Sequence, residues 1–237
     1  MERLDKILAS TGKWSRREVK QLVRQGRVLA DGRPAASPEE KYDPEAVEFT
    51  VDGEPVGYRR VTWLMMNKPG GVLSATEDGR GATVLDLLPP ELRRIGLFPV
   101  GRLDKDTEGL LLLTDDGETA HRLLSPKYHV DKVYYTRVAG CLTEEDCQAF
   151  RQGMVLGDGL HCLPAELEIL SAGEESEALV TLREGKFHQV KRMLAARGKP
   201  VRYLKRMQMG NLTLDPTLEP GQFRFLTGEE WKSLGTP

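Results

Sequence analysis

The sequence predicts an α+β protein in which a small N-terminal α/β domain, residues 1–57, precedes a larger domain, residues 58–237, of β-strands and flanking helices. Three observations indicate this class. Apolar residues recur at helical spacing near the N-terminus, an acidic stretch with Pro and Gly follows, and strand-like and helical segments alternate in the remainder. With 237 residues, of which 39% are hydrophobic, the chain is long enough to bury a core.

Two short helices and a hairpin are expected in the N-terminal domain. The first helix is interrupted at Thr11-Gly12, and the second begins with a capping box, Ser15 followed by Glu18. Asp31-Gly32 is typical of a hairpin turn. The residues that form the apolar stripes of the two helices are Leu4, Ile7, Leu8, Val19, Leu22 and Val23. The acidic stretch 34–58 is interpreted as the end of a small β element and a linker near residue 57.

The larger domain is expected to contain several strands and helices. A buried strand at 61–69 ends at Pro69, and a short helix at 83–88 is stopped by Pro89-Pro90. Further strands are expected at 96–104, 109–117, 132–138, 167–170, 178–182, 204–207, 211–214 and 223–225. Further helices are expected at 118–125, at 143–153 with Thr143 as its cap, and at 188–198 with Gly198 at its end.

Charge is unevenly distributed, although the net charge is only −2. Residues 1–33 carry nine Lys/Arg against four Asp/Glu, and residues 183–206 carry nine against one. The segment 34–58 carries one Lys against seven Asp/Glu. This pattern suits a polyanionic partner that approaches particular faces, and it is equally compatible with ordinary solvated surfaces.

Several classes of protein are excluded or disfavoured. No run of about 18 apolar residues is present, and the N-terminus lacks the apolar stretch of a signal peptide, so a cytoplasmic protein without a membrane span is expected. The three cysteines form neither a disulfide framework nor a C-x2-C pair, so no zinc site and no other metal site is predicted. The sequence also lacks a phosphate-binding P-loop motif.

The string GRLDKDTEGLLLLTDDG, residues 101–117, is the first candidate site. It places Arg102, Asp104, Lys105 and Asp106 on a loop between two strands. A carboxylate held beside fixed cations can stay ionised and act as a nucleophile or base. Residue type and spacing alone favour a simpler interpretation, a charged turn with a surface ion pair.

The string EGKFHQVKRM, residues 184–193, is the second candidate site. Its His188, Lys191 and Arg192 fall in the first turns of a predicted helix, so their side chains are expected to emerge close together. Lys191 or Arg192 could pair with a buried carboxylate or contact phosphate. His188 could equally be a solvated or core histidine.

Residues 3–34, RLDKILASTGKWSRREVKQLVRQGRVLADGRP, resemble an S4 RNA-binding module. The resemblance implies that the basic residues off the apolar stripe of the second helix bind RNA: Arg16, Arg17, Lys20 and Arg24. Further motifs resemble, in order, the RsuA/RluB/RluE/RluF family of pseudouridine synthases: NKPGG (67–71), TVLDLL (83–88), FPVGRLDKDTEGLLLLTDDG (98–117), HRLLSP (121–126), DKVY (131–134) and EGKFHQVKRM (184–193).

This second resemblance implies a catalytic domain with a mixed, mainly antiparallel sheet, and it implies roles for particular residues. Asp104 would be the catalytic carboxylate, Lys191 its partner, and Tyr134 the ring that stacks on the target base and assists proton removal. Tyr135 is the nearest competitor of Tyr134, because adjacent strand residues face opposite ways. Residues expected to bind RNA are Arg102, which would hold the flipped-out nucleotide or fill its gap, His188 and Arg192.

The implied activity is the isomerisation of uridine to pseudouridine in ribosomal RNA, with the 16S small-subunit RNA favoured because EGKFHQVKRM is closer to the small-subunit members. An isomerisation consumes no redox cofactor and no metal, so neither is expected. The partner would be ribosomal RNA, free or in a partly assembled subunit, and the protein a monomer. The alternatives are a 23S enzyme of the same family and a non-catalytic RNA-binding assembly factor. Whether Asp104 attacks C1′ or abstracts a sugar proton stays open.

Overall fold

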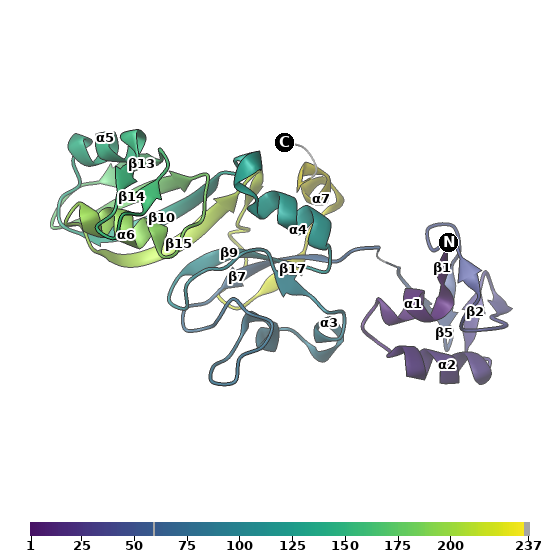
Figure 1. Cartoon of the computed structure of the whole chain (residues 1–237). Helices are drawn as coiled ribbons and strands as arrows, with labels where there is room; N and C mark the ends of the chain where they lie inside the picture. The colour runs from purple at the N-terminus through teal and green to yellow at the C-terminus, as the bar shows by residue number, and fades with distance from the viewer. Residues whose placement is uncertain (59, 235–237) are drawn as a thin grey trace. The chain divides into compact units, whose positions relative to one another are not determined.

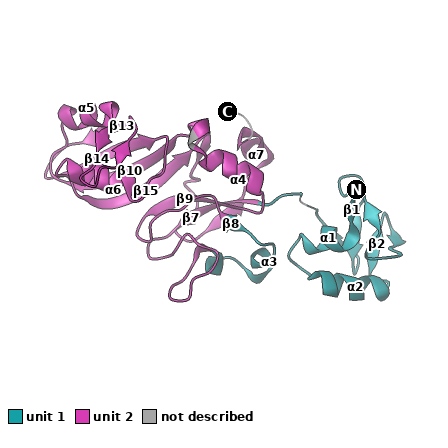
Figure 2. Cartoon of the chain, viewed as in Figure 1, with its two compact units in different colours: residues 1–62, 85–98 teal, residues 63–84, 99–237 magenta. Residues whose placement is uncertain are grey.

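The computed structural model describes residues 1–58 and 60–234 in two compact units (Figure 2). The first unit comprises residues 1–62 and 85–98, and the second comprises residues 63–84 and 99–237. The grouping of 85–98 with the N-terminal residues has no counterpart in the sequence pattern. The domain limit between residues 57 and 58 stays a prediction.

The first unit is an α/β module, as expected (Figure 1). Its helices are α1 (Leu4–Ala9), α2 (Arg16–Arg24) and α3 (Pro90–Arg93). One sheet has the order β3-β2-β5-β6, formed by Arg33–Pro34, Val28–Ala30, Phe49–Val51 and Glu54–Val56. A second pairing joins β1 (Glu2–Arg3) to β4 (Lys41–Tyr42). The β5–β6 hairpin lies in the acidic stretch, where the sequence indicated only the end of a small β element.

Local sequence signals explain this unit. The predicted capping box of α2 is present: Ser15 Oγ accepts from the Glu18 amide at 3.2 Å, and Glu18 Oε2 accepts from the Ser15 amide at 2.6 Å. These bonds satisfy amides that the first helical turn leaves without partners. The predicted hairpin turn is also confirmed, with φ of 48° at Asp31 and 73° at Gly32. Both apolar stripes lie in one buried core.

The second unit is built on a mainly antiparallel sheet, with the order β13-β14-β10-β15-β9-β7-β17. In that order the strands are Glu166–Ser171, Glu175–Leu182, Lys132–Ala139, Val201–Met209, Glu108–Thr114, Trp63–Lys68 and Phe223–Phe225. The shorter strands are β8 (Phe98–Pro99), β11 (Met154–Val155), β12 (His161–Cys162) and β16 (Leu212–Thr213). The helices are α4 (Gly117–Leu124), α5 (Glu144–Gln152), α6 (Gln189–Ala196) and α7 (Gly228–Leu234), with a 3₁₀ turn at Pro126–Tyr128. A further 3₁₀ turn, Val84–Leu87, begins on the last residue of the segment 63–84 and continues into the segment 85–98 of the first unit. Figure 1 shows α5 and α6 near β13, β14 and β10.

A parallel pairing between β15 and β9 joins the two halves of this sheet. It brings Gly109 opposite Arg206, and a Cβ atom at residue 109 would lie 2.2 Å from the Arg206 carbonyl oxygen. Gly109 also has φ of 99°, a conformation that residues with side chains rarely adopt. Only glycine therefore allows β15 to approach the start of β9, directly after the loop that carries Asp104.

The short helix expected at residues 83–88 is present as a 3₁₀ helix at Val84–Leu87. Pro89-Pro90 does not simply stop it, because Pro90 is the first residue of α3. Proline suits that position, since the first helical amide has no intrahelical acceptor to lose. The sequence pattern also missed α7.

Candidate active site

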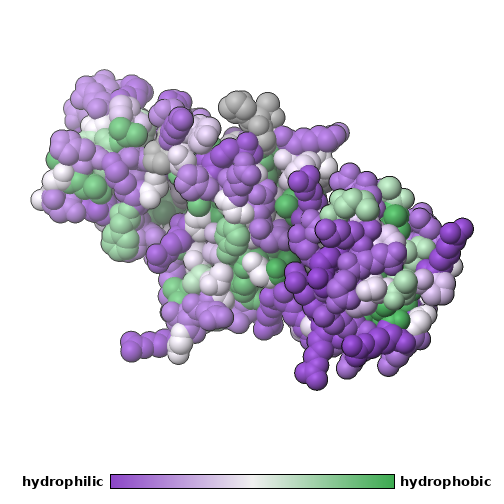
Figure 3. All heavy atoms as spheres, turned by 45° about the vertical axis from the view of Figure 1, so that its right-hand side comes forward, coloured by the Kyte–Doolittle hydropathy of each residue, from purple (hydrophilic) through white to green (hydrophobic). Residues whose placement is uncertain are grey.

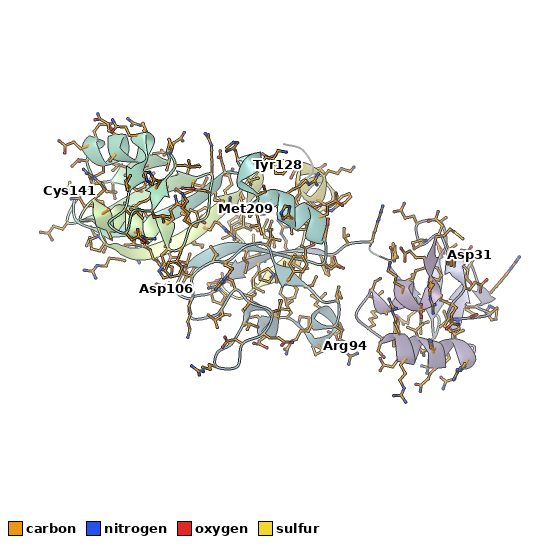
Figure 4. All side chains as sticks on the ribbon, viewed as in Figure 1. Asp31, Arg94, Asp106, Tyr128, Cys141 and Met209 are labelled. Atoms are coloured by element: carbon orange, nitrogen blue, oxygen red, sulfur yellow. The ribbon has the colours of Figure 1, made fainter. Side chains whose placement is uncertain are left out.

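The side chains of His188 and Lys191 converge on Asp104, which lies on the loop between β8 and β9. Lys191 Nζ lies 2.9 Å from Asp104 Oδ2, and His188 Nε2 lies 3.4 Å from Asp104 Oδ1. Lys191 also contacts Asp106 Oδ1 at 2.6 Å. Asp106 is labelled in Figure 4, and its side chain is 76% exposed, whereas that of Asp104 is only 25% exposed. The expectation that Asp104 lies close to Lys191 is confirmed.

A buried lysine that sequence reasoning did not single out holds this loop in place. Lys68, at the end of β7, has no exposed surface, and its ammonium donates to the carbonyls of Pro69 at 3.0 Å, Lys105 at 3.2 Å and Thr107 at 2.8 Å. The Lys105 carbonyl also accepts from the Gly71 amide at 2.7 Å. The NKPGG motif carried the signal, because a lysine at the end of a wholly buried strand needs buried acceptors.

Burial lowers the pKa of Lys68 to about 8, although Asp106, Glu108 and Asp104 favour its charge. In the unfolded chain its pKa is near 10.5. Between these values the unfolded chain binds more protons than the folded one, so folding releases a proton and stability rises with pH. Below pH 8 both states are protonated and this effect vanishes.

We therefore predict how the difference in the free energy of unfolding, wild type minus Lys68→Met, depends on pH. This difference should be constant below pH 8 and should increase by about 1 kcal/mol per pH unit between pH 8 and 10. Urea denaturation at a series of pH values measures both quantities. A difference that stays constant from pH 7 to pH 10 would contradict the assignment of this buried titration to Lys68.

The start of α6 is a rigid turn. His188 is its N-cap residue and adopts a left-handed conformation, with φ of 50° and ψ of 33°. Gln189 is buried, accepts from the Lys186 amide at 3.0 Å and donates to Glu184 at 2.6 Å. Glu184 is also buried, and it accepts from the Leu163 amide at 2.9 Å. These bonds fix a backbone conformation that would otherwise be unfavourable for a residue with a side chain.

The basic residues near the start of α6 have different partners. His188 and Lys191 are three positions apart, and both reach Asp104. Arg192 does not contact Asp104 and does not line the pocket described below, because its Nη2 pairs with Asp158 Oδ1 at 2.5 Å.

Lys191 is shared between two carboxylates. Its burial disfavours the charge, but hydrogen bonds to Asp106 and then to Asp104 outweigh this cost and raise the pKa of Lys191. The same hydrogen bond from Lys191 lowers the pKa of Asp106. Lys191 is therefore a fixed cation at neutral pH, which favours the ionised form of a neighbouring carboxyl group.

A pocket opens beside this cluster, with Arg102, Asp104, Thr107, Tyr134, His188 and Leu204 in its lining. Tyr134 comes from β10 and is 9% exposed. Its neighbour Tyr135 faces the other side of the sheet, where its ring lies 6.1 Å from that of Tyr203. The expectation that Tyr134, rather than Tyr135, faces the same cleft as Asp104 is confirmed. The pocket thus combines a carboxylate, cations and an aromatic ring. These groups can hold a planar, polar nucleobase beside a carboxylate that acts as a nucleophile or as a general base.

Within residues 1–58 and 60–234, no helix has the length and apolar character needed to cross a membrane, and no three His, Cys, Asp or Glu side chains are grouped as metal ligands would be. Cys141 is exposed, whereas Cys147 and Cys162 are buried, and all three are free thiols.

The basic residues of α2 lie on the surface of the first unit. Arg16, Arg17 and Arg24 are exposed, and Lys20 pairs with Glu39 at 3.2 Å. Hydrophilic residues dominate the face of this unit that Figure 3 shows. Three of the four predicted RNA-binding residues of α2 are therefore accessible to phosphate, while Lys20 would have to leave its carboxylate partner.

Comparison with known proteins agrees with both parts of the chain. The family model for RNA pseudouridylate synthases matches residues 62–196, and the model for the S4 domain matches residues 2–47. A solved structure, described as the crystal structure of a pseudouridylate synthase, is 35% identical and superposes with a TM-score of 0.69 over 99% of this chain and 100% of that one.

Two full-length relatives are similar in sequence. The uncharacterized RNA pseudouridine synthase YtzG of Bacillus subtilis is 52% identical over 99% of each chain. The ribosomal small subunit pseudouridine synthase A of Vibrio cholerae is 42% identical over 98% of this chain and 99% of that protein. The similarity therefore includes the N-terminal unit as well as the strands that carry the pocket.

Proposed function

The chain belongs to the RNA pseudouridylate synthase family, and on that premise we propose that it converts uridine to pseudouridine in small-subunit ribosomal RNA. The observation that carries the small-subunit assignment is the 42% identity, over almost the full length of both chains, to a ribosomal small subunit pseudouridine synthase. We propose a monomeric cytoplasmic enzyme whose partner is ribosomal RNA, free or in a partly assembled subunit.

We propose Asp104 as the catalytic carboxylate. Uridine loses its N1–C1′ bond, gains a C5–C1′ bond, and exchanges the proton on C5 for one on N1, so atoms and electrons balance without a cofactor. Such a reaction needs an ionised carboxylate close to the sugar and a group that removes the C5 proton. Asp104 and Lys191 form a 2.9 Å ion pair beside the pocket that Tyr134 lines. This arrangement supports Asp104 as the carboxylate, Lys191 as its cationic partner and Tyr134 as the residue that assists removal of the C5 proton.

The remaining site residues are proposed to bind RNA. Arg102 and His188 line the same pocket and could hold the nucleotide that leaves the stack. Arg192 would contact phosphate only after leaving Asp158. On this proposal the residues of the pocket carry out the reaction, and the basic surfaces provide most of the affinity for RNA.

The function is tested by mapping pseudouridines in ribosomal RNA from cells with and without the gene. We expect one pseudouridine of the small-subunit RNA to disappear and to return when the wild-type gene is restored. Loss of a large-subunit pseudouridine instead would replace the small-subunit assignment. An unchanged map of both subunits would contradict the proposal altogether.

The exposed arginines of α2 lead to a prediction about salt. Replacing Arg16, Arg17 and Arg24 together by Gln should weaken binding of small-subunit RNA, because each arginine that neutralises a phosphate releases counterions. The slope of log K against log salt should become less steep by about 2 to 3. Arg27→Gln is the matched control, since Arg27 is already paired with Asp52. Filter binding from low to moderate salt measures the slopes, and equal slopes for the triple variant and the wild type would contradict an RNA-binding role for α2.

A further inference from the structure

Phe187 is an exposed aromatic residue at the edge of the site. Its exposed fraction is 73%, far above that of any other aromatic side chain among the described large hydrophobic residues that are exposed. Its ring stacks on His188, with 3.8 Å between ring centroids and 19° between planes. A single exposed apolar residue is common in proteins, so the position and the fixed orientation of this ring carry the argument.

The orientation of Phe187 is fixed from both sides. His188 follows it in a left-handed conformation, and the buried Glu184–Gln189 pair holds the turn that precedes it. On its other edge the His188 ring reaches Asp104, with 3.4 Å between Nε2 and Oδ1. The two stacked rings therefore form a short column that begins at the carboxylate and ends at a free aromatic face.

Three cations lie close in sequence to this column, and each is paired with a carboxylate: Lys186 with Glu184 at 2.9 Å, Lys191 with Asp104 at 2.9 Å and Arg192 with Asp158 at 2.5 Å. An RNA phosphate can compete with a carboxylate for such a cation. An exposed aromatic face beside these cations suits an unstacked nucleobase, because such bases are recognised by stacking on rings and by nearby cations. An apolar protein segment would gain little from the cations.

We propose that the outer face of Phe187 is a subsite for an unpaired nucleobase adjacent to the target uridine. When the uridine turns into the pocket, its neighbour loses a stacking partner. Phe187 replaces that partner, and the Phe187–His188 column spans the distance from the neighbouring base to Asp104. This subsite rests on the proposed function, because it presupposes that the pocket receives a nucleotide from RNA.

Steady-state kinetics test the subsite. The substrate is small-subunit RNA labelled with [5-³H]uridine and prepared from cells that lack the gene. Phe187→Ala should lower kcat/KM by about 5- to 100-fold, which is the loss expected for one stacked base, mainly through a higher KM. Phe187→Trp should restore most of the activity. Leu170→Ala removes a different exposed apolar side chain, 49% exposed on β13, and should behave like the wild type.

A binding measurement separates this inference from the proposed function. In an Asp104→Asn background, Phe187→Trp places an indole on the column, and its fluorescence should be quenched when the same RNA is added, relative to Asp104→Asn alone. Quenching without tritium release by the wild type would sink the proposed function and leave the subsite standing. An active wild type with an equally active Phe187→Ala variant and no quenching would overturn the subsite.

Discussion

Replacing Asp104 by Asn should abolish tritium release from small-subunit RNA labelled with [5-³H]uridine, while the fold and RNA binding are retained. The amide has almost the same shape as the carboxylate, and Asn can still accept a hydrogen bond from Lys191. It can neither attack C1′ nor remove a sugar proton. The rate should fall by roughly 10²- to 10⁴-fold or more, as expected when a nucleophile or general base is removed.

Asp106→Asn is the matched control for this variant. Asp106 contacts the same lysine at 2.6 Å, but its side chain is 76% exposed and it does not line the pocket. Its loss should change the rate by less than about tenfold, since an exposed ion pair contributes little. Thermal unfolding should show the same midpoint for both variants within a few degrees. If Asp104→Asn still released tritium at the rate of Asp106→Asn, the catalytic carboxylate would have to be sought elsewhere.

The sequence predicted the fold well where local physics is decisive. The buried strand at residues 63–68, which begins with four apolar residues, the capping box at Ser15 and the Asp31-Gly32 turn each depend on neighbouring residues only, and all three are present. The helix that Pro90 begins was missed, because a proline that ends one element can equally start the next.

For the site, local physics was much less informative. Asp104 on its own resembled a charged turn, and only the ordered motifs indicated a catalytic role. The structure confirms the implied pairing of Asp104 with Lys191 at 2.9 Å, and it adds the close approach of β15 to the start of β9 that Gly109 allows. Lys68 was overlooked because it donates hydrogen bonds to backbone carbonyls of the loop. The sequence does not show which carbonyl groups of a loop point toward a given side chain.

Replacing Lys191 by Met should cause the second largest loss of activity. It removes the cation that holds the Asp104 carboxylate at 2.9 Å in the pocket, and it leaves Asp104 and Asp106 on the same loop without their shared partner. We expect kcat to fall by roughly 10²- to 10³-fold, within the range that positioned acid–base groups contribute. Stability should change by only about 1 kcal/mol, because the ion pairs are partly exposed.

Two further variants decide whether charge or shape is responsible. Lys191→Arg keeps the cation but presents a planar fork in place of a compact ammonium, so it should recover much of the activity lost in Lys191→Met. Lys199→Met removes a positive charge beyond the end of α6 and should leave kcat unchanged, which excludes a general effect of net charge. A Lys191→Met enzyme with the kcat of the wild type would show that Asp104 needs no cationic partner, and Lys191 would then be a contact of the loop alone.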